Sequence, residues 1–354
     1  CRPPTHPIIG AAPRYSLGSN LAPDCEILLE KPRMSGEDLE FRPLSPLAMG
    51  CELLGGTDWG SVDLPSARDA IRCALEAGIT VFDTADAYGL GRSEGELSSV
   101  LGSERHEVTI VTKGGLRWFN NPSGGRATII RDSSYAYLSS AIDASLRRLE
   151  LDVIPIYLVH WPDSKTPLAE TIACLEEARS AGKIERYGLS NFGRKEVKIA
   201  SELGSISVFQ DELHLLLPEE QKLLVAFARE LGLETLTYGP LAQGLLTGKY
   251  ACGYEFDNSD RRHRLDHFKE RAYGKHLPVM DALMQISDEI GRPPAQLAIR
   301  WVLETGVATS VVVGARTCRQ VLDNCDTLSW SLCESHVQAL NQARKIAGLT
   351  DVFE

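Results

Sequence analysis

The feature that most restricts the fold of this chain is a unit that recurs from about residue 60. Each copy contains an amphipathic helix, a glycine, a short apolar strand and then a polar residue. In the first copy, DLPSARDAIRCALEAGITVFD, Asp63 can cap the helix, Pro65 suits its first turn and Gly78 ends it. Because helices alternate with strands, the unit predicts a parallel sheet covered by helices.

Eight strands are predicted in this way, at residues 46–49, 80–82, 108–112, 154–159, 185–188, 206–209, 234–237 and 309–313. Eight strand–helix repeats in about 250–300 residues favour a closed (β/α)8 TIM barrel. A doubly wound open sheet is the alternative, although no GxGxxG fingerprint follows the first strand.

The ends of the chain add to this prediction. Residues 1–25 are rich in Pro, Gly and Ser, and we expect a poorly ordered arm there. Residues 26–354 are predicted to be a single barrel domain. EILLEK and LEFRPL flank a turn-like PRMSGED and predict an N-terminal β-hairpin, and helices are expected at the C-terminus.

Charge and cysteine content narrow the class of protein. The net charge of −11 argues against nucleic acid as a partner, because an acidic protein repels phosphate backbones. No stretch approaches the ~18 apolar residues of a membrane span, so no membrane partner is predicted. The nine cysteines include no CxxC pair, and we expect reduced cysteines in a cytoplasmic protein. The oligomeric state stays open.

Polar residues follow the predicted strands. The strand endings are Asp83, Lys113, His160, Ser190–Asn191, Gln210, Tyr238 and Gly314. In a barrel these ends converge on one mouth, where active sites are built. Singly, each residue could serve the fold, for example Asp83 as a turn cap or Lys113 at the rim. A ring of such residues on one face predicts a functional site.

The residue types at this mouth suit proton transfer. Tyr88 follows Asp83 by five positions, and an unperturbed tyrosine has a pKa near ~10. A lysine ammonium within hydrogen-bonding reach stabilises the phenolate and lowers that pKa, so we expect Lys113 to bond both Asp83 and Tyr88. A neutral His160 can donate to a carbonyl oxygen. Together they suit protonation of a carbonyl while a cofactor supplies hydride.

Several stretches carry a family resemblance. GITVFDTADAYGLGRSEGELSSVLG, VTIVTKGG, YLVHWPD, YGLSNF, YGPLAQGLLTGKY and VGARTCRQVLDN resemble those of the aldo-keto reductase superfamily, in particular bacterial and fungal members, from about residue 41 to 345. The resemblance implies an NADPH-dependent enzyme that reduces an aldehyde or ketone to an alcohol. It implies a catalytic tetrad of Asp83, Tyr88, Lys113 and His160, with Tyr88 as the general acid.

The resemblance also implies a cofactor site for NADPH, with NADH less favoured. Ser190, Asn191 and Gln210 would bind the nicotinamide carboxamide, and Tyr238 would stack on the ring. Gly239, Leu241 and Gly244 would follow the pyrophosphate; family members usually have serine at position 239. Arg316 would bind the 2′-phosphate, because a guanidinium forks onto phosphate oxygens. Gly314, Gln320, Asp323 and Asn324 would complete the adenine end.

The substrate is expected to be a small carbonyl compound of open identity. Candidate pocket walls are Trp59, Trp118, Phe119 and Trp161, each of which could equally be packing. One alternative function is a nicotinamide-binding regulatory or scaffold subunit with little turnover. Another is a metal-assisted hydrolase or isomerase using Asp83, His160 and Asp163, but no HxH or paired-carboxylate set supports a metal site.

Overall fold

The computed structural model describes residues 41–119 and 127–350. The unit that contains the barrel begins at Arg42, and the predicted domain boundary at residue 26 lies outside the described residues. The barrel strands are β1 (Leu47–Gly50), β2 (Val81–Asp83), β3 (Thr109–Gly114), β6 (Ile154–Val159), β7 (Ile184–Ser190), β8 (Val208–Glu212), β9 (Glu234–Tyr238) and β10 (Ser310–Gly314). Each overlaps one of the strands predicted from the sequence.

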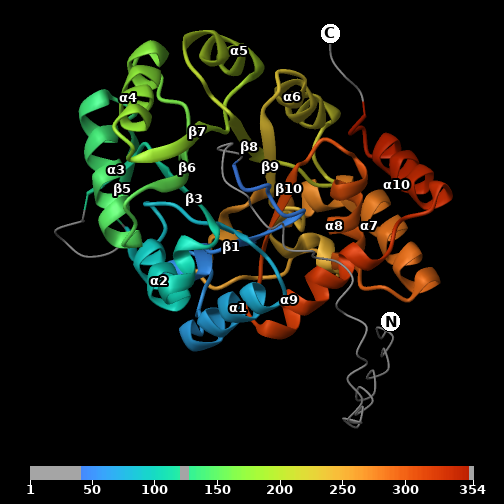
Figure 1. Cartoon of the computed structure of the whole chain (residues 1–354). Coiled ribbons are helices and arrows are strands. Elements are labelled where there is room, and N and C mark those ends of the chain that lie inside the picture. Colours follow the sequence, from blue (N-terminus) through green and yellow to red (C-terminus); the bar gives the residue numbers. More distant parts are fainter. Residues whose placement is uncertain (1–40, 120–126, 351–354) are drawn as a thin grey trace, which may run out of the picture. The chain divides into compact units, whose positions relative to one another are not determined.

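These strands form a closed barrel in the order β1-β10-β9-β8-β7-β6-β3-β2, and all neighbouring pairs are parallel. Gly50 on β1 is the register partner of both Asp83 on β2 and Gly314 on β10. Figure 1 shows the strands at the centre, with helices around them. The (β/α)8 prediction is confirmed, and the doubly wound alternative is excluded because the sheet closes.

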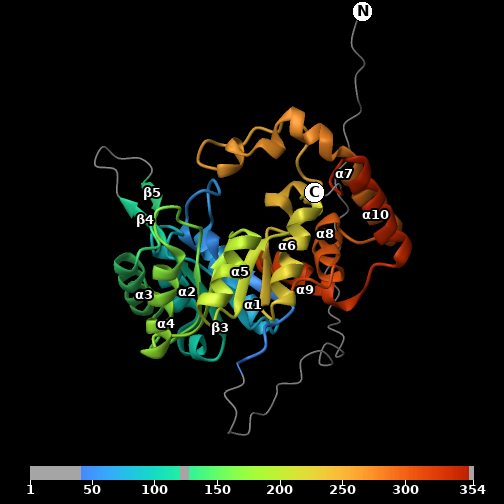
Figure 2. The same cartoon turned by 90° about the horizontal axis from the view of Figure 1, so that it is seen from above.

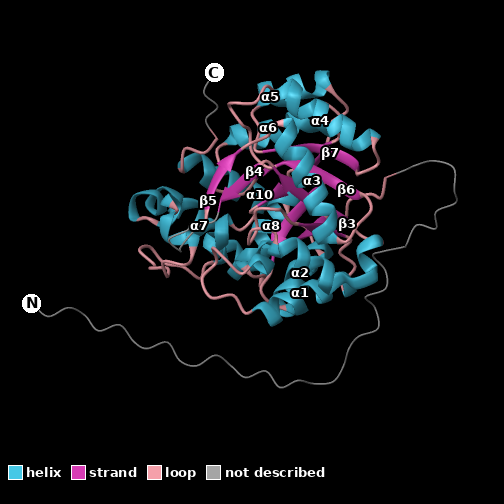
Figure 3. Ribbon diagram, turned by 90° about the vertical axis from the view of Figure 1, so that its left-hand side faces the viewer, coloured by secondary structure: helices cyan, strands magenta, loops and turns pink. Residues whose placement is uncertain are grey.

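The helices follow the strands in sequence and surround them (Figure 3). They are α1 (Leu64–Glu76), α2 (Arg92–Leu101), α3 (Tyr135–Leu149), α4 (Leu168–Ser180), α5 (Arg194–Leu203), α6 (Glu219–Glu230), α7 (Glu270–Ile290), α8 (Pro294–Glu304), α9 (Cys318–Cys325) and α10 (Glu334–Ile346). Short 3-10 turns are η2 (Glu52–Gly55), η3 (Gly102–His106), η4 (Ala242–Thr247), η5 (Arg261–Arg264), η6 (Asp266–Phe268) and η7 (Asp326–Ser329). None of the helices in the described ranges has the length and apolar character of a membrane span.

Helix α1 illustrates how the sequence sets an element's bounds. The Asp63 carboxylate accepts a hydrogen bond from the Ser66 amide at 3.4 Å, which caps the first turn. The inner face buries Ala67, Ala70, Ile71 and Ala74. Gly78, at φ 87°, reverses the chain into β2. The cap and the glycine therefore fix the length of the helix, and its apolar face attaches it to the barrel.

Two cysteines far apart in sequence are joined. Cys73 of α1 and Cys318 of α9, 245 positions apart, form a disulfide bond. The prediction of reduced cysteines is therefore wrong for this pair. No spacing rule could have found it, because the two residues meet only when closure of the barrel packs α1 against α9.

Two further regions bear on the predicted elements. In the glycine-rich stretch after Lys113, where the sequence analysis predicts no strand, β4 (Leu116–Phe119) and β5 (Thr128–Arg131) pair as an antiparallel hairpin. The predicted N-terminal arm and hairpin lie outside the described residues, except for residues 41–44, which form no strand. The β4–β5 hairpin was missed because a polar, glycine-rich stretch obscured its short strands.

The segment between β9 and α7 reaches across to the β1–α1 connection (Figure 2, orange and blue). Trp59 and Asp260 form a β-bridge, and the Arg261 amide donates to the Asp58 carbonyl at 2.9 Å. The Arg261 side chain forms an ion pair with Glu52 at 2.5 Å. This segment therefore brings a cation, Arg261, to the C-terminal side of the barrel.

Candidate active site

Strand alternation directs the predicted site residues into the barrel. The innermost apolar cluster includes Val81, Val111, Leu158, Val208 and Leu236. Side chains on a strand alternate between faces, so the residue two positions later points the same way. Those residues, in the same order, are Asp83, Lys113, His160, Gln210 and Tyr238. The barrel interior is therefore apolar below and polar at its C-terminal mouth.

A buried ionic cluster lies at this mouth. Lys113 Nζ donates to Asp83 Oδ1 at 2.6 Å and to the Thr84 carbonyl at 2.8 Å. Gln210 Nε2 donates to Asp83 Oδ2 at 2.6 Å from the opposite side of the barrel. Asp83 is 4% exposed, and Lys113 and Gln210 are 1% exposed. A buried charge pair is tolerable when further hydrogen bonds satisfy it, and here both carboxylate oxygens are bonded.

Tyr88 lies beside this cluster, on the connection between β2 and α2. Its ring centroid is 5.5 Å from Lys113 Nζ, and it makes an edge contact with His160 at 5.7 Å between ring centroids. Gly89 follows at φ 59°, and a Cβ there would lie 2.3 Å from the Gly55 carbonyl oxygen. Close contact between two glycine backbones therefore holds the tyrosine loop against η2.

The structure differs from the prediction for Tyr88 on one point. Among the described residues, the hydrogen bonds of Lys113 Nζ go to Asp83 and Thr84, and none goes to the Tyr88 hydroxyl. Burial raises the pKa of Tyr88, and the carboxylates of Glu52 and Asp83 raise it further. Neither effect follows from the spacing of these residues in the sequence. The tyrosine is therefore fully protonated at neutral pH, which is the form that donates a proton.

His160 is neutral. Its amide donates to the Gly114 carbonyl at 2.8 Å, which fixes the residue after β6. Burial lowers the pKa of His160 well below its usual value, and the nearby cations Lys113 and Arg261 lower it further. Its Nδ1 atom is buried without a partner in the described part of the chain. A neutral imidazole with a free nitrogen can donate to or accept from a bound molecule.

A second polar group adjoins His160. Asn191, at φ 64°, donates from Nδ2 to the His160 carbonyl at 2.8 Å and to Ser190 Oγ at 3.0 Å. Its Oδ1 accepts from the Tyr238 hydroxyl at 2.7 Å. Ser190 is buried, and Tyr238 is partly exposed at the mouth. Ser190, Asn191 and Tyr238 therefore form one connected group, adjacent to Gln210 through the Ser190–Gln210 register.

Backbone conformation accounts for glycine at position 239. Gly239 has φ 69°, and a Cβ there would lie 3.0 Å from Glu212 Oε1. A serine would therefore be strained at this position. Gly244, at φ 99°, lies in the η4 turn, and Leu241 is partly buried against a core cluster. At Gly239 and Gly244, the loop 239–247 therefore exposes backbone and no side chain.

Arg316 lies at a cavity of about 350 Å³, together with Trp59, Ser61 and residues of the 250–262 segment. It donates to the Trp59 carbonyl at 2.8 Å, and its amide donates to Gln320 Oε1 at 2.7 Å. Asp323 is ion-paired with Arg319 at 3.0 Å. Gly314 is exposed at the end of β10, and Asn324 is partly exposed on α9.

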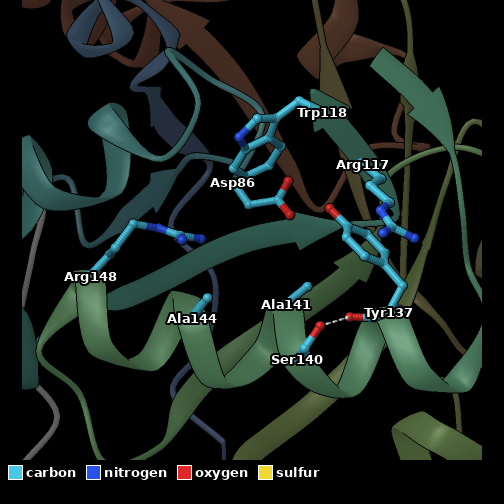
Figure 4. A pocket seen from close by; sticks show the side chains of 8 residues that line it. All are labelled: Asp86, Arg117, Trp118, Tyr137, Ser140, Ala141, Ala144 and Arg148. Atoms are coloured by element: carbon cyan, nitrogen blue, oxygen red, sulfur yellow. Dashed lines mark hydrogen bonds between the residues drawn. The ribbon is translucent and has the colours of Figure 1, made fainter. Parts of the chain in front are cut away.

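The predicted aromatic walls are dispersed. The Arg261 guanidinium lies over the Trp59 ring, with Cζ 4.4 Å from the ring centroid. The Trp59 backbone carbonyl accepts a hydrogen bond from Arg316. Trp118 lines a different cavity, together with Asp86 (Figure 4). Phe119 is 44% exposed, and Trp161 stacks with Arg131 at 4.8 Å. The structure therefore separates Trp118 from Trp59 rather than joining all four walls in one pocket.

Sequence reasoning missed residues that act electrostatically on the site. The Glu52 carboxylate raises the pKa of Tyr88, and the Arg261 guanidinium lowers it. Arg261 also lowers the pKa of His160. Arg261 belongs to the basic run RRHR at residues 261–264, which is the signal in the sequence for a cation there. Glu52 lies two residues after the end of β1, and only the fold brings it near Tyr88.

Comparisons with known proteins identify the family to which this chain belongs. The profile of the Aldo/keto reductase family matches residues 46–345. Aldo-keto reductase YhdN of Bacillus subtilis is 31% identical over 84% of this chain and 89% of its own. The NADH-specific methylglyoxal reductase of Escherichia coli is 30% identical over 84% of this chain and 94% of its own.

A solved structure is similar over most of the chain. The glycerol dehydrogenase AKR11B4 from Gluconobacter oxydans has a TM-score of 0.79 and 31% identity, covering 88% of this chain and 94% of that one. The profile match spans the whole barrel, including every strand that carries a site residue. The chain therefore belongs to the Aldo/keto reductase family of oxidoreductases.

Proposed function

We propose that this protein reduces an aldehyde or ketone to an alcohol, with NADPH as the hydride source and Tyr88 as the proton donor. The observation that best supports this is the buried cluster of Asp83, Lys113 and Gln210 beside Tyr88 and His160. A buried ion pair beside a tyrosine that itself contacts a histidine suits proton transfer better than it suits stability.

Each residue of the tetrad has a role in this proposal. Tyr88 donates its hydroxyl proton to the carbonyl oxygen as the alcohol forms. The Lys113 ammonium, held by Asp83 and Thr84, stabilises the negative charge that develops on the phenol oxygen. Neutral His160 orients the carbonyl oxygen by a hydrogen bond. A bound reduced nicotinamide supplies the hydride.

The residues at the mouth suit a nicotinamide cofactor. His160 Nδ1 is a buried polar atom without a partner in the described part of the chain, Asn191 is bonded to the His160 carbonyl, and Gly239 lacks a side chain where the chain turns. We propose that Ser190, Asn191 and Gln210 bind the carboxamide, that Tyr238 stacks on the ring, and that Gly239, Leu241 and Gly244 follow the pyrophosphate. Gly314, Gln320, Asp323 and Asn324 would lie at the adenine end.

The preference for NADPH rests on Arg316. Its guanidinium lines the 350 Å³ cavity, where a 2′-phosphate could bind it in a forked geometry. Replacement by alanine (Arg316→Ala) should raise the KM for NADPH about tenfold or more, because a charged hydrogen bond contributes about 1.5–3 kcal/mol. The KM for NADH should stay constant. Equal effects on both cofactors would contradict the assignment.

The substrate is proposed to be a small carbonyl compound, with Trp59, Phe119 and Trp161 as candidate walls of its pocket. We also expect a cytoplasmic location. Thiol trapping in intact cells tests this location through the Cys73–Cys318 pair, because cytoplasmic reductants act on disulfides. Trapping of both residues as free thiols would support a cytoplasmic location, and an intact disulfide would contradict it.

A spectrophotometric assay tests the reaction class. NADPH oxidation by the purified chain is followed at neutral pH over a panel of aliphatic, aromatic and dicarbonyl compounds. The proposal expects oxidation that depends on both carbonyl and enzyme, with an alcohol as product. Tight binding of NADPH without turnover of any carbonyl would instead favour a regulatory subunit.

A further inference from the structure

A second cavity lies behind the tyrosine loop, between β4 and α3. It has a volume of about 210 Å³, and its lining includes Asp86, Arg117, Trp118, Tyr137, Ala144 and Arg148. Figure 4 shows the Asp86 carboxylate between the rings of Trp118 and Tyr137, with the two arginines on either side. None of the tetrad side chains lines this cavity. It is therefore a site separate from the barrel mouth.

The unusual group in this cavity is the carboxylate of Asp86. The residue is 1% exposed, and neither Oδ1 nor Oδ2 has a hydrogen-bond partner among the described residues. Its backbone is fixed, because its amide donates to the Lys113 carbonyl at 3.0 Å. Buried polar groups are nearly always bonded, and a buried charge without a partner is costly. A site with this property is completed by a ligand that donates hydrogen bonds.

The two arginines do not supply that donor. Arg117 is ion-paired with Asp132 at 3.2 Å, and Arg148 is ion-paired with Glu94 at 2.6 Å. Each guanidinium therefore has its own carboxylate, and the charge of Asp86 is left over. A cation would therefore complement Asp86, the one charged residue of this lining without an ion-pair partner in the described structure.

The aromatic rings favour the same class of ligand. Trp118 and Tyr137 both line the cavity, and the Tyr137 hydroxyl is already bonded to the Leu116 carbonyl at 3.0 Å. Tyr137 therefore offers mainly its π-face, which attracts a cation, as the contact with Arg117 at 5.7 Å illustrates. An apolar cavity of about 150 Å³ accommodates benzene, so this one has room for a ligand slightly larger.

We propose that this cavity binds a small organic ammonium compound, whose N–H groups donate to Asp86 and whose carbon skeleton packs against Trp118, Tyr137 and Ala144. The electrostatics agree. Burial raises the pKa of Asp86, and Glu94 raises it further, while Arg148, the Ala87 amide and Lys113 lower it. A bound ammonium offsets the cost of keeping this carboxylate charged.

Calorimetric titration of the full chain with benzylammonium tests the proposal, and benzamide serves as a neutral ligand of similar size. We expect saturable binding of benzylammonium and at least tenfold weaker binding of benzamide. Asp86→Asn should weaken benzylammonium at least tenfold by removing the charge. Ala144→Leu should weaken it similarly by filling the space. Asp152→Asn, at an exposed carboxylate, is the matched control and should bind like the wild type.

Thermal unfolding of each variant shows that it is folded, so loss of binding cannot be confused with loss of structure. Quenching of tryptophan fluorescence, absent in Trp118→Phe, gives an independent readout of occupancy. Failure of benzylammonium to bind the wild type would overturn the proposal. Equal binding of benzamide, or undiminished binding to Asp86→Asn, would also overturn it.

Discussion

Asp83 and Asp86 lie three residues apart on one segment, and both are buried, but their surroundings are opposite. Both oxygens of Asp83 are bonded, to Lys113 and to Gln210, each at 2.6 Å. Neither oxygen of Asp86 has a partner in the described structure. The first carboxylate faces the barrel interior, and the second faces a cavity beside α3.

The difference shows that burial alone does not identify the role of a charged residue. The paired carboxylate holds a lysine in place, so its charge is part of a fixed local structure. In the described structure, the unpaired one is stabilised only by the neighbouring Ala87 amide and by the more distant cations Arg148 and Lys113. We infer that the barrel interior is organised for reaction, whereas the cavity behind the same loop is organised for binding.

Removal of the partner of Asp83 should have the largest effect. Lys113→Met would leave that carboxylate with only Gln210 and would remove the cation beside Tyr88. We expect kcat to fall about 10³-fold, and the free energy of unfolding to fall by about 3–5 kcal/mol. Steady-state kinetics and urea unfolding measure both. Lys165→Met, at an exposed lysine, is the control, and an unchanged kcat in Lys113→Met would refute the role of the pair.

Displacement of the loop that carries Tyr88 should have the second-largest effect on catalysis. In Gly89→Ala, the new Cβ would meet the Gly55 carbonyl oxygen at 2.3 Å and move Tyr88. We expect kcat to fall about tenfold, since a displacement of ~1 Å impairs catalysis. Gly102→Ala has a similar φ of 56° but open space around its Cβ, so it carries only the left-handed penalty. Equal kcat values in the two variants would show that the loop contact does not position Tyr88.

Neutralisation of the unpaired carboxylate should have the smallest effect, and it should stabilise the fold. Without ligand, Asp86→Asn should raise the free energy of unfolding at neutral pH by about 1–3 kcal/mol, because a buried unpaired charge is removed. The folded-state pKa of Asp86 is raised above 3.8. The folded protein therefore binds this proton more tightly than the unfolded chain does.

This difference in proton affinity makes the free energy of unfolding depend on pH. The wild type should lose stability relative to Asp86→Asn as the pH rises from about 4 through the folded-state pKa, and the difference should then stay constant. Urea unfolding at a series of pH values measures this, with Asp152→Asn as the control for loss of a surface charge. If the stability advantage of Asp86→Asn over the wild type instead grew as the pH fell, the Asp86 carboxylate would have to be paired.

The sequence predicted the barrel because its periodicity is strong and repeats in every unit. It also predicted which residues would meet, because Asp83, Lys113, His160 and Gln210 each follow an apolar strand whose alternation directs them inward. It did not predict the cavity at Asp86, because that site depends on α3 and on the β4–β5 hairpin. It also missed the Cys73–Cys318 bond, which depends on closure of the barrel.

The central claim is that Tyr88 donates the proton at a site built by Asp83, Lys113 and His160. Tyr88→Phe removes one oxygen from a partly exposed ring and should leave the fold intact. The most direct test measures kcat for carbonyl reduction together with the Kd for NADPH in this variant. Our account predicts that kcat falls at least 10²-fold while the Kd changes less than about threefold. An unchanged kcat would contradict it.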